Sequence, residues 1–141
     1  MRYTEAQITE LLKKHQLKRT AGRVGLLRAL AKQSRPVSVA TLSDALRGEV
    51  DTVTIYRSLE LFEHEGIVRR VYAHEGHVDY EFVHEGDHHH HVICKKCGAI
   101  EDIDICNVLE IERRVLQGAK NFSEINGHSL EFFGLCKRCA K

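Results

Sequence analysis

Four of the five cysteines stand in two pairs whose spacing is typical of a metal site. The pairs are Cys94-Lys95-Lys96-Cys97 and Cys136-Lys137-Arg138-Cys139. Two intervening residues let both thiolates of a pair turn toward one ion, and two pairs complete a closed tetrahedral site of four sulfurs. The pattern therefore predicts structural zinc. A redox dithiol is the alternative, although that chemistry usually uses a single pair at a helix start. Cys106 lacks such a partner, and we interpret it as an apolar residue.

Four consecutive histidines, His88 to His91, form a second candidate site. In an extended segment alternate side chains point in opposite directions, so His88 and His90 face one way and His89 and His91 the other. Two imidazoles on each face can start two metal sites for iron, zinc, manganese, cobalt or nickel. The alternative is a solvated polar loop. Several carboxylates could add oxygen ligands: Glu81, Asp87, Glu101, Asp102, Asp104 and Glu110.

One motif points to a different class of protein. His84-Glu85-Gly86-Asp87-His88 matches HExxH, the zinc-peptidase signature, in which both histidines lie on one helical face and the glutamate is the general base. Gly86 and Asp87 at its centre, with strand-like runs on both sides, disfavour a helix. A metallopeptidase is therefore a distant alternative.

The formal net charge of +1 conceals an uneven distribution. Residues 1–35 carry nine Lys/Arg and two Glu, a net charge of +7, whereas residues 36–141 carry twelve and eighteen, a net charge of −6. A basic N-terminal segment favours a nucleic-acid partner, although a solvated basic face is the simpler alternative. A protein that only stores or buffers metal would not need this charge.

The elements needed to position these residues can be read from hydrophobic spacing. Four short helices are predicted in the first half, around Ile8 to Leu12, Val24 to Leu30 after a Thr20 cap, Val39 to Leu46 after a Ser38 cap, and Ile55 to Phe62 after Asp51 or Thr52. Strand-like runs at 68–72 and 78–83, joined by the Gly-containing tip 74–77, predict a hairpin.

Helices followed by a hairpin indicate a winged helix-turn-helix, in which the last helix before the hairpin enters the major groove. At the start of that helix four side chains can donate to phosphates or base edges: Thr52, Thr54, Tyr56 and Arg57. Further basic residues can contact the backbone or minor groove: Lys13, Lys14, Lys18, Arg19 and Arg23.

The second half reads as mixed α and β. Strands are predicted at 92–94, 99–105 and 129–135, with a helix whose apolar face is Val108, Ile111 and Val115. We therefore expect an α+β protein with a winged-helix DNA-binding domain at 1–83, a hinge at 84–87 and a small α/β metal-binding dimerisation domain with a four-cysteine zinc site at 88–141.

The length and composition of the chain are consistent with a small protein of two domains. With 141 residues, 43% hydrophobic and 29% charged, the chain is too short for a large enzyme, and no apolar run reaches the ~18 residues of a membrane span. Its first residues lack the apolar core of a signal peptide. We therefore expect a cytoplasmic protein with no membrane partner. In the reducing cytoplasm, cysteines more often hold metal than form disulfides.

Across nearly the whole chain these motifs resemble the ferric uptake regulator (Fur) family. The matching stretches are Leu17 to Thr20 with Arg23, Val53 to Leu59, Gly66 to Val68, His88 to Cys94, Cys97-Gly98, and His128 to Leu130 before Cys136 and Cys139. The resemblance implies a homodimeric, metal-activated transcriptional repressor that binds palindromic double-stranded DNA operators, and not an enzyme.

Position by position, the resemblance implies three metal sites. The four paired cysteines match the structural zinc site. The regulatory site is implied to use Glu81, His89, His91 and Asp102, and the second site His88, His90, His128 and Glu110, with Glu110 requiring a one-residue shift. Tyr56 and Arg57 resemble the pair that contacts the groove, and Lys18 the lysine of the minor groove.

One departure from the family concerns the regulatory site. Many members place a histidine ligand where this chain has Pro36, which cannot coordinate, so His84 is the expected substitute. Zinc sensors often add cysteine near Val83, and none is present here. We therefore expect iron(II) as the regulatory ion, with manganese or zinc as alternatives. Asp102 is the acid of the peroxide-sensing branch, which keeps peroxide sensing open.

Overall fold

The computed structural model describes residues 3–72, 76–84, 86, 88–105 and 107–141, except for the side chain of Val108. The chain forms two compact units, residues 1–86 and 87–141, which are described in turn. No helix in the described ranges is long and apolar enough to cross a membrane.

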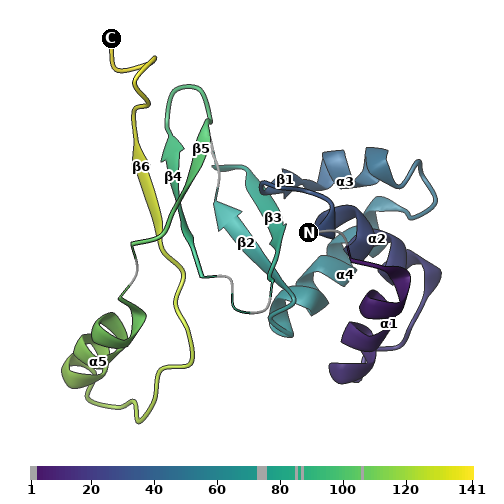
Figure 1. Ribbon diagram of the computed structural model, residues 1–141, viewed down its shortest axis with the longest axis horizontal. Helices are drawn as coiled ribbons and strands as arrows, with labels where there is room; N and C mark the ends of the chain where they lie inside the picture. Colours follow the sequence, from purple (N-terminus) through teal and green to yellow (C-terminus); the bar gives the residue numbers. More distant parts are fainter. Residues whose placement is uncertain (1–2, 73–75, 85, 87, 106) are drawn as a thin grey trace. The chain divides into compact units, whose positions relative to one another are not determined.

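Four helices and a small sheet make up the first unit (Figure 1). The helices are α1 (Glu5–Lys14), α2 (Ala21–Ala31), α3 (Val39–Ala45) and α4 (Thr52–His64). The strands β1 (Val37–Ser38), β2 (Val68–Tyr72) and β3 (Val78–Phe82) form an antiparallel sheet in the order β1-β3-β2. The predicted helices and hairpin strands are confirmed, and residues 73–75 of the hairpin tip lie outside the described residues.

Side-chain caps fix where the four helices begin. The predicted caps Thr20 and Ser38 accept hydrogen bonds from the backbone N–H groups of Arg23 and Thr41. Asp51, and not Thr52, caps α4. Such side chains satisfy N–H groups that have no partner inside the helix.

The core of the first unit is built from the predicted apolar stripes. Ile55, Leu59 and Phe62 of α4 are fully buried and pack in one cluster with side chains of the other helices and of the wing strands β2 and β3. Because α4 buries this face, its opposite face remains available to solvent.

Strand β1 was not predicted. Val37 and Ser38 pair antiparallel with Tyr80 and Asp79 of β3. Two residues are too few for a recognisable alternation, and their extended conformation depends on a partner more than forty residues away.

The second unit has one sheet and one helix. Its elements are β4 (His90–Cys94), β5 (Ile100–Ile103), α5 (Val108–Gly118) and β6 (Glu131–Gly134), with strand order β5-β4-β6. β4 pairs antiparallel with β5 and parallel with β6. These elements lie where the sequence predicts them, although β4 starts two residues earlier and β5 and β6 are shorter at both ends.

The second unit buries little apolar surface. Among its described residues only His90, His91, Ile93 and Cys94 are buried. Many large apolar side chains are instead exposed, at 38% to 80% of their surface: Ile105, Leu109, Ile111, Val115, Phe122, Phe132, Phe133 and Leu135. Large apolar side chains exposed in this number on one small unit are typical of an interface.

Candidate metal centres and nucleic-acid interface

The parallel pairing of β4 and β6 brings the two cysteine pairs together. Cys94 ends β4 and pairs with Gly134, which ends β6, so both strands deliver their following residues to the same edge of the sheet. The Lys95 N–H donates to the Gly134 carbonyl at 2.8 Å. The first cysteine pair begins at the last residue of β4, and the second begins two residues after β6 ends. The fifth cysteine, Cys106, lies outside the described residues.

The four sulfurs have the spacing of a tetrahedral site. Cys94, Cys97, Cys136 and Cys139 place their sulfur atoms within 4.8 Å of one another, and those of Cys97 and Cys136 are 3.7 Å apart. Zn–S bonds of ~2.3 Å in a tetrahedron separate two sulfurs by about 3.8 Å. Gly98 allows the tight turn, with φ +70° and an N–H that donates to the Cys94 carbonyl. The donor set and spacing fit zinc.

Hydrogen bonds shift the pKa values of these thiols in different directions. Backbone N–H groups, chiefly that of Cys136 at 3.4 Å, stabilise the Cys94 thiolate and lower its pKa to about 6. The Cys136 pKa is also lowered, mainly by the Cys139 backbone N–H. Cys139 shares a hydrogen bond with the Cys136 side chain, which raises the Cys139 pKa to about 12. Adjacent thiolates repel each other, and a divalent cation would remove that repulsion.

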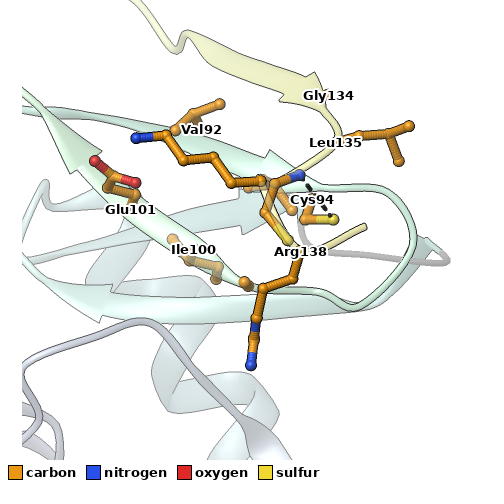
Figure 2. Close-up of a pocket in the computed structure, with 11 residues that line it drawn as sticks. Val92, Cys94, Ile100, Glu101, Gly134, Leu135 and Arg138 are labelled. Carbon is orange, nitrogen blue, oxygen red and sulfur yellow. Dashed lines mark hydrogen bonds between the residues drawn. The ribbon is translucent and has the colours of Figure 1, made fainter. Parts of the chain in front are cut away.

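Beside the cysteines lies a hollow of about 470 Å³. Figure 2 shows its walls, which combine apolar side chains such as Val92, Ile100 and Leu135 with the charged Glu101 and Arg138. The dashed line in Figure 2 is the hydrogen bond from the Cys136 N–H to the Cys94 sulfur. The metal-site candidate therefore borders an open, partly apolar surface of the sheet.

One face of the histidine tract gathers three imidazoles. His88 and His90 lie with His128, each pair of rings having centroids 5.1 Å apart. The Nε2 atoms of His90 and His128 are 3.4 Å apart. Two nitrogens that bind one ion at ~2.1 Å in a tetrahedron are separated by about this distance. The predicted grouping of these three histidines is therefore brought together in the structure.

A carboxylate other than the predicted Glu110 lies beside that grouping. Glu110 forms ion pairs on its own helix, with Arg113 at 3.0 Å and Arg114 at 2.7 Å. Glu112, which sequence reasoning missed, lies 3.8 Å from Nδ1 of His128. The structure thus favours Glu112 over Glu110, since the helical register of α5 decides which carboxylate faces His128.

The other two histidines, His91 on β4 and His89 just before it, lie together. The rings of His89 and His91 are 5.0 Å apart and nearly perpendicular, and Nε2 of His91 lies 3.5 Å from a carboxylate oxygen of Asp102. Asp102 is the β5 residue paired with His91. The predicted alternation along the tract, and the approach of Asp102, are both present.

Two further predicted ligands belong to the first unit. Glu81 on β3 is largely buried and accepts a hydrogen bond from Nε of Arg69 at 2.7 Å. His84 stacks on Tyr3 and lies against Phe82. Nδ1 of His84 is buried and makes no hydrogen bond within the described ranges, which leaves it able to ligate.

The peptidase motif does not have the required geometry. Glu85 and Asp87 lie outside the described residues, but His84 and His88 are not helical, and Gly86 is in a turn with φ +81°. Such a φ is incompatible with an α-helix, so the two histidines do not share a helical face.

Helix α4 presents the predicted DNA-contacting side chains to solvent. Thr52, Thr54, Tyr56 and Arg57 are exposed, with Tyr56 at 53%. Thr54 hydrogen-bonds the Asp51 carboxylate through both its backbone N–H and its hydroxyl. Because a carboxylate occupies the helix start, phosphate binding at that end is disfavoured, and Tyr56 and Arg57 remain the stronger candidates.

Of the predicted backbone contacts, Lys18 and Arg19 differ in their surroundings. Both are exposed. Arg19 pairs with Glu5 at 2.6 Å and donates to Thr9, so its charge is partly compensated within the unit. The Lys18 carbonyl accepts from Arg23, which fixes the backbone of this loop.

Comparison with known sequences identifies the family. The sequence profile of the Ferric uptake regulator family matches residues 14–133. The chain belongs to that family. Family members are transcription regulators and not enzymes, so this Fur-family chain is a metal-responsive regulator with a winged-helix domain followed by a dimerisation domain.

Some relatives of this Fur-family chain align over nearly its full extent. The ferric uptake regulation protein of Legionella pneumophila is 33% identical over 136 residues, covering 93% of this chain and 97% of its own length. The manganese-containing ferric uptake regulator structure from Pseudomonas aeruginosa is 28% identical with a TM-score of 0.71, covering 92% of this chain and 98% of that one. The Helicobacter pylori regulator Fur, described with three functional metal binding sites, shares the fold at 22% identity and a TM-score of 0.74, covering 99% and 96% of the two chains.

Proposed function

We propose that this protein is an iron(II)-dependent transcriptional repressor that binds palindromic operators as a homodimer. In the proposal, residues 1–83 read DNA, 84–87 act as a hinge, and 88–141 dimerise and hold metal. The observation that carries it is the division of the histidine tract into two groups, with His88 and His90 beside His128, and His89 and His91 beside Asp102.

Three metal sites are proposed. Zinc would hold the four paired cysteines as a structural site. The second site would use His88, His90 and His128, with Glu112 replacing Glu110. The regulatory site would use His89, His91 and Asp102 from the second unit, with Glu81 and His84 contributed by the first. The Helicobacter pylori structure, with its three metal sites, supports this number.

A ligand set drawn from both units would make metal binding depend on their arrangement. An ion that binds the DNA-competent arrangement more tightly than other arrangements raises operator affinity by the same coupling free energy. Couplings of ~1–3 kcal/mol are typical and change affinity roughly 5- to 150-fold. The ion would thus act by linkage and not by contacting DNA.

Dimerisation is supported by the exposed apolar side chains of the second unit. This unit has few buried side chains in the described ranges and offers exposed side chains from α5, β6 and the segment between them. A second copy would cover such a surface, and a twofold axis would present two recognition helices to a palindrome.

Iron(II) is proposed as the regulatory ion because of the ligand chemistry. The histidine sets contain nitrogen and oxygen donors without thiolate, which suits iron(II) or manganese(II), whereas the four cysteines suit zinc. The Pseudomonas aeruginosa relative with manganese shows that such a fold holds this ion too. Peroxide sensing is the second candidate, favoured by Asp102 beside His91.

An operator titration tests the proposal. A palindromic duplex selected from random DNA by the metal-loaded protein is titrated anaerobically with Fe(II), Mn(II) and Zn(II). His89→Ala combined with His91→Ala should abolish the metal-dependent gain in affinity, while zinc content and the dimer persist. His64→Ala removes a histidine that is 84% exposed and outside the three sets, and should respond like the parent.

A double variant that responds to metal as the parent does would refute the assigned regulatory site. Protein that binds metal but shows no preference for any DNA would refute the repressor. Exposure of the Fe(II)-loaded protein to peroxide, followed by mass analysis of the His89 to His91 peptide, decides between iron and peroxide sensing.

A further inference from the structure

We propose that Arg69 is a resident counter-cation of Glu81 and sets the metal concentration at which this protein responds. A regulatory ion that binds Glu81 has to displace Arg69 or tolerate its positive charge. The inference rests on the proposed role of Glu81 as a ligand. Its structural basis lies entirely within the first unit.

The contact between the two residues is built into the wing. Arg69 on β2 and Glu81 on β3 are directly opposite in the antiparallel register. Nε of Arg69 donates to Oε2 of Glu81 at 2.7 Å. The side chains are 30% and 13% exposed, so the carboxylate is largely withdrawn from water. Strand pairing holds both backbones in place, so the contact does not depend on a flexible loop.

The positive charge of Arg69 determines how strongly a metal ion can bind Glu81. A carboxylate with so little access to water is costly unless a cation or hydrogen-bond donors compensate it, and Arg69 supplies both. The guanidinium stays charged across the physiological pH range. A divalent ion bound to the same carboxylate would lie close to this positive charge, and the repulsion lowers metal affinity relative to a neutral side chain. Arg69 therefore raises the metal concentration needed for occupancy.

Arg70, the next residue on β2, provides a matched control for Arg69. Arg70 pairs with Glu63 at 2.8 Å and lies over the Tyr80 ring, 5.9 Å from its centroid. Glu63 is not a candidate ligand, and Arg70 and Arg69 are exposed to a similar extent, 33% and 30%. Removing Arg70 deletes the same charge from the same strand without touching Glu81.

The test measures Mn(II) affinity directly, without DNA. Zinc-loaded full-length protein carries His128→Ala to weaken the second cluster, and free Mn(II) is measured by electron paramagnetic resonance during titration. Arg69→Gln should bind Mn(II) ~5- to 30-fold more tightly, because a partly screened charge-assisted interaction is removed. Arg69→Met, which keeps the apolar stem, should do the same. Arg69→Lys and Arg70→Gln should stay within about threefold of the parent.

A Glu81→Ala variant separates this inference from the ligand assignment. If Glu81→Ala leaves Mn(II) affinity unchanged, Glu81 is not a ligand, and both the assignment and the inference fail. If Glu81→Ala weakens Mn(II) binding but folded Arg69→Gln and Arg69→Met bind Mn(II) no more tightly than the parent, only the inference fails. Tighter binding in both Arg69 variants, with Arg70→Gln unchanged, supports it.

Discussion

Replacing Leu109 by alanine should weaken the proposed dimer strongly. Leu109 lies in α5 and is 80% exposed, more than any other large apolar side chain described as exposed. The substitution removes three carbons, worth about 2.4 kcal/mol at ~0.8 kcal/mol per buried carbon group. Because only the exposed four-fifths of the Leu109 side chain can become buried at the interface, about 2 kcal/mol of this free energy applies there. Twofold symmetry counts each side chain twice, giving an upper value of about 4 kcal/mol, or almost a thousandfold in Kd.

Sedimentation equilibrium of zinc-loaded protein, from nanomolar to high micromolar concentration, measures this Kd. Val53→Ala serves as the control, since Val53 is an exposed aliphatic residue of the first unit, at 57%. It should leave the dimer unchanged. A Kd for Leu109→Ala within threefold of the parent value would show that α5 does not contribute this side chain to the interface, and the dimerisation argument from exposed apolar area would fail.

Other outcomes follow from the same structure. Cys94→Ser should lose bound zinc and the dimer together, measured by metal analysis and sedimentation, whereas Cys106→Ser should keep both; a zinc-free variant that stays dimeric would show the cysteine site to be dispensable. Arg57→Ala should weaken operator binding by ~5- to 150-fold and random DNA less, measured by fluorescence anisotropy, and equal losses on both would make Arg57 a phosphate contact. The pKa of Asp51 is lowered by hydrogen bonds from Thr54, so its contribution to stability is present above the unfolded pKa and is lost as pH falls below about 4 through the folded pKa. Asp51→Asn should therefore unfold at a lower temperature than the parent at neutral pH, with the difference shrinking in acid; a difference that does not depend on pH would contradict an ionic cap.

Local signals in the sequence predicted most of the fold. Thr20, Ser38 and Asp51 are polar caps before apolar stripes, and each begins a helix as expected. The alternation of the histidine tract depends only on β4 being extended, so the division into two sets was also predictable. Each of these features is determined by residues that are close to one another in the sequence.

Features that depend on distant partners were harder to predict. β1 exists because Val37 and Ser38 pair with β3, and no local pattern marks it. Glu112 replaces Glu110 beside His128 because the register of α5 relative to residue 128 is a tertiary property. The ion pair of Arg69 with Glu81 required the hairpin register, which depends on a turn whose length the sequence leaves open.

The parallel pairing of β4 with β6 also orders the events of protein synthesis. All strands of the first unit are present once β3 has been made, including β1, which pairs with β3, so this unit can fold as soon as β3 emerges from the ribosome. In the second unit β4 can pair early with β5, but its other edge needs β6, some forty residues later, and the second cysteine pair follows β6. N-terminal units generally fold first during synthesis. If the proposed function holds, a newly made chain passes through a stage with a complete first unit, the proposed DNA-binding domain, but without the proposed zinc site and dimer, and at that stage it would bind DNA only as a weak monomer.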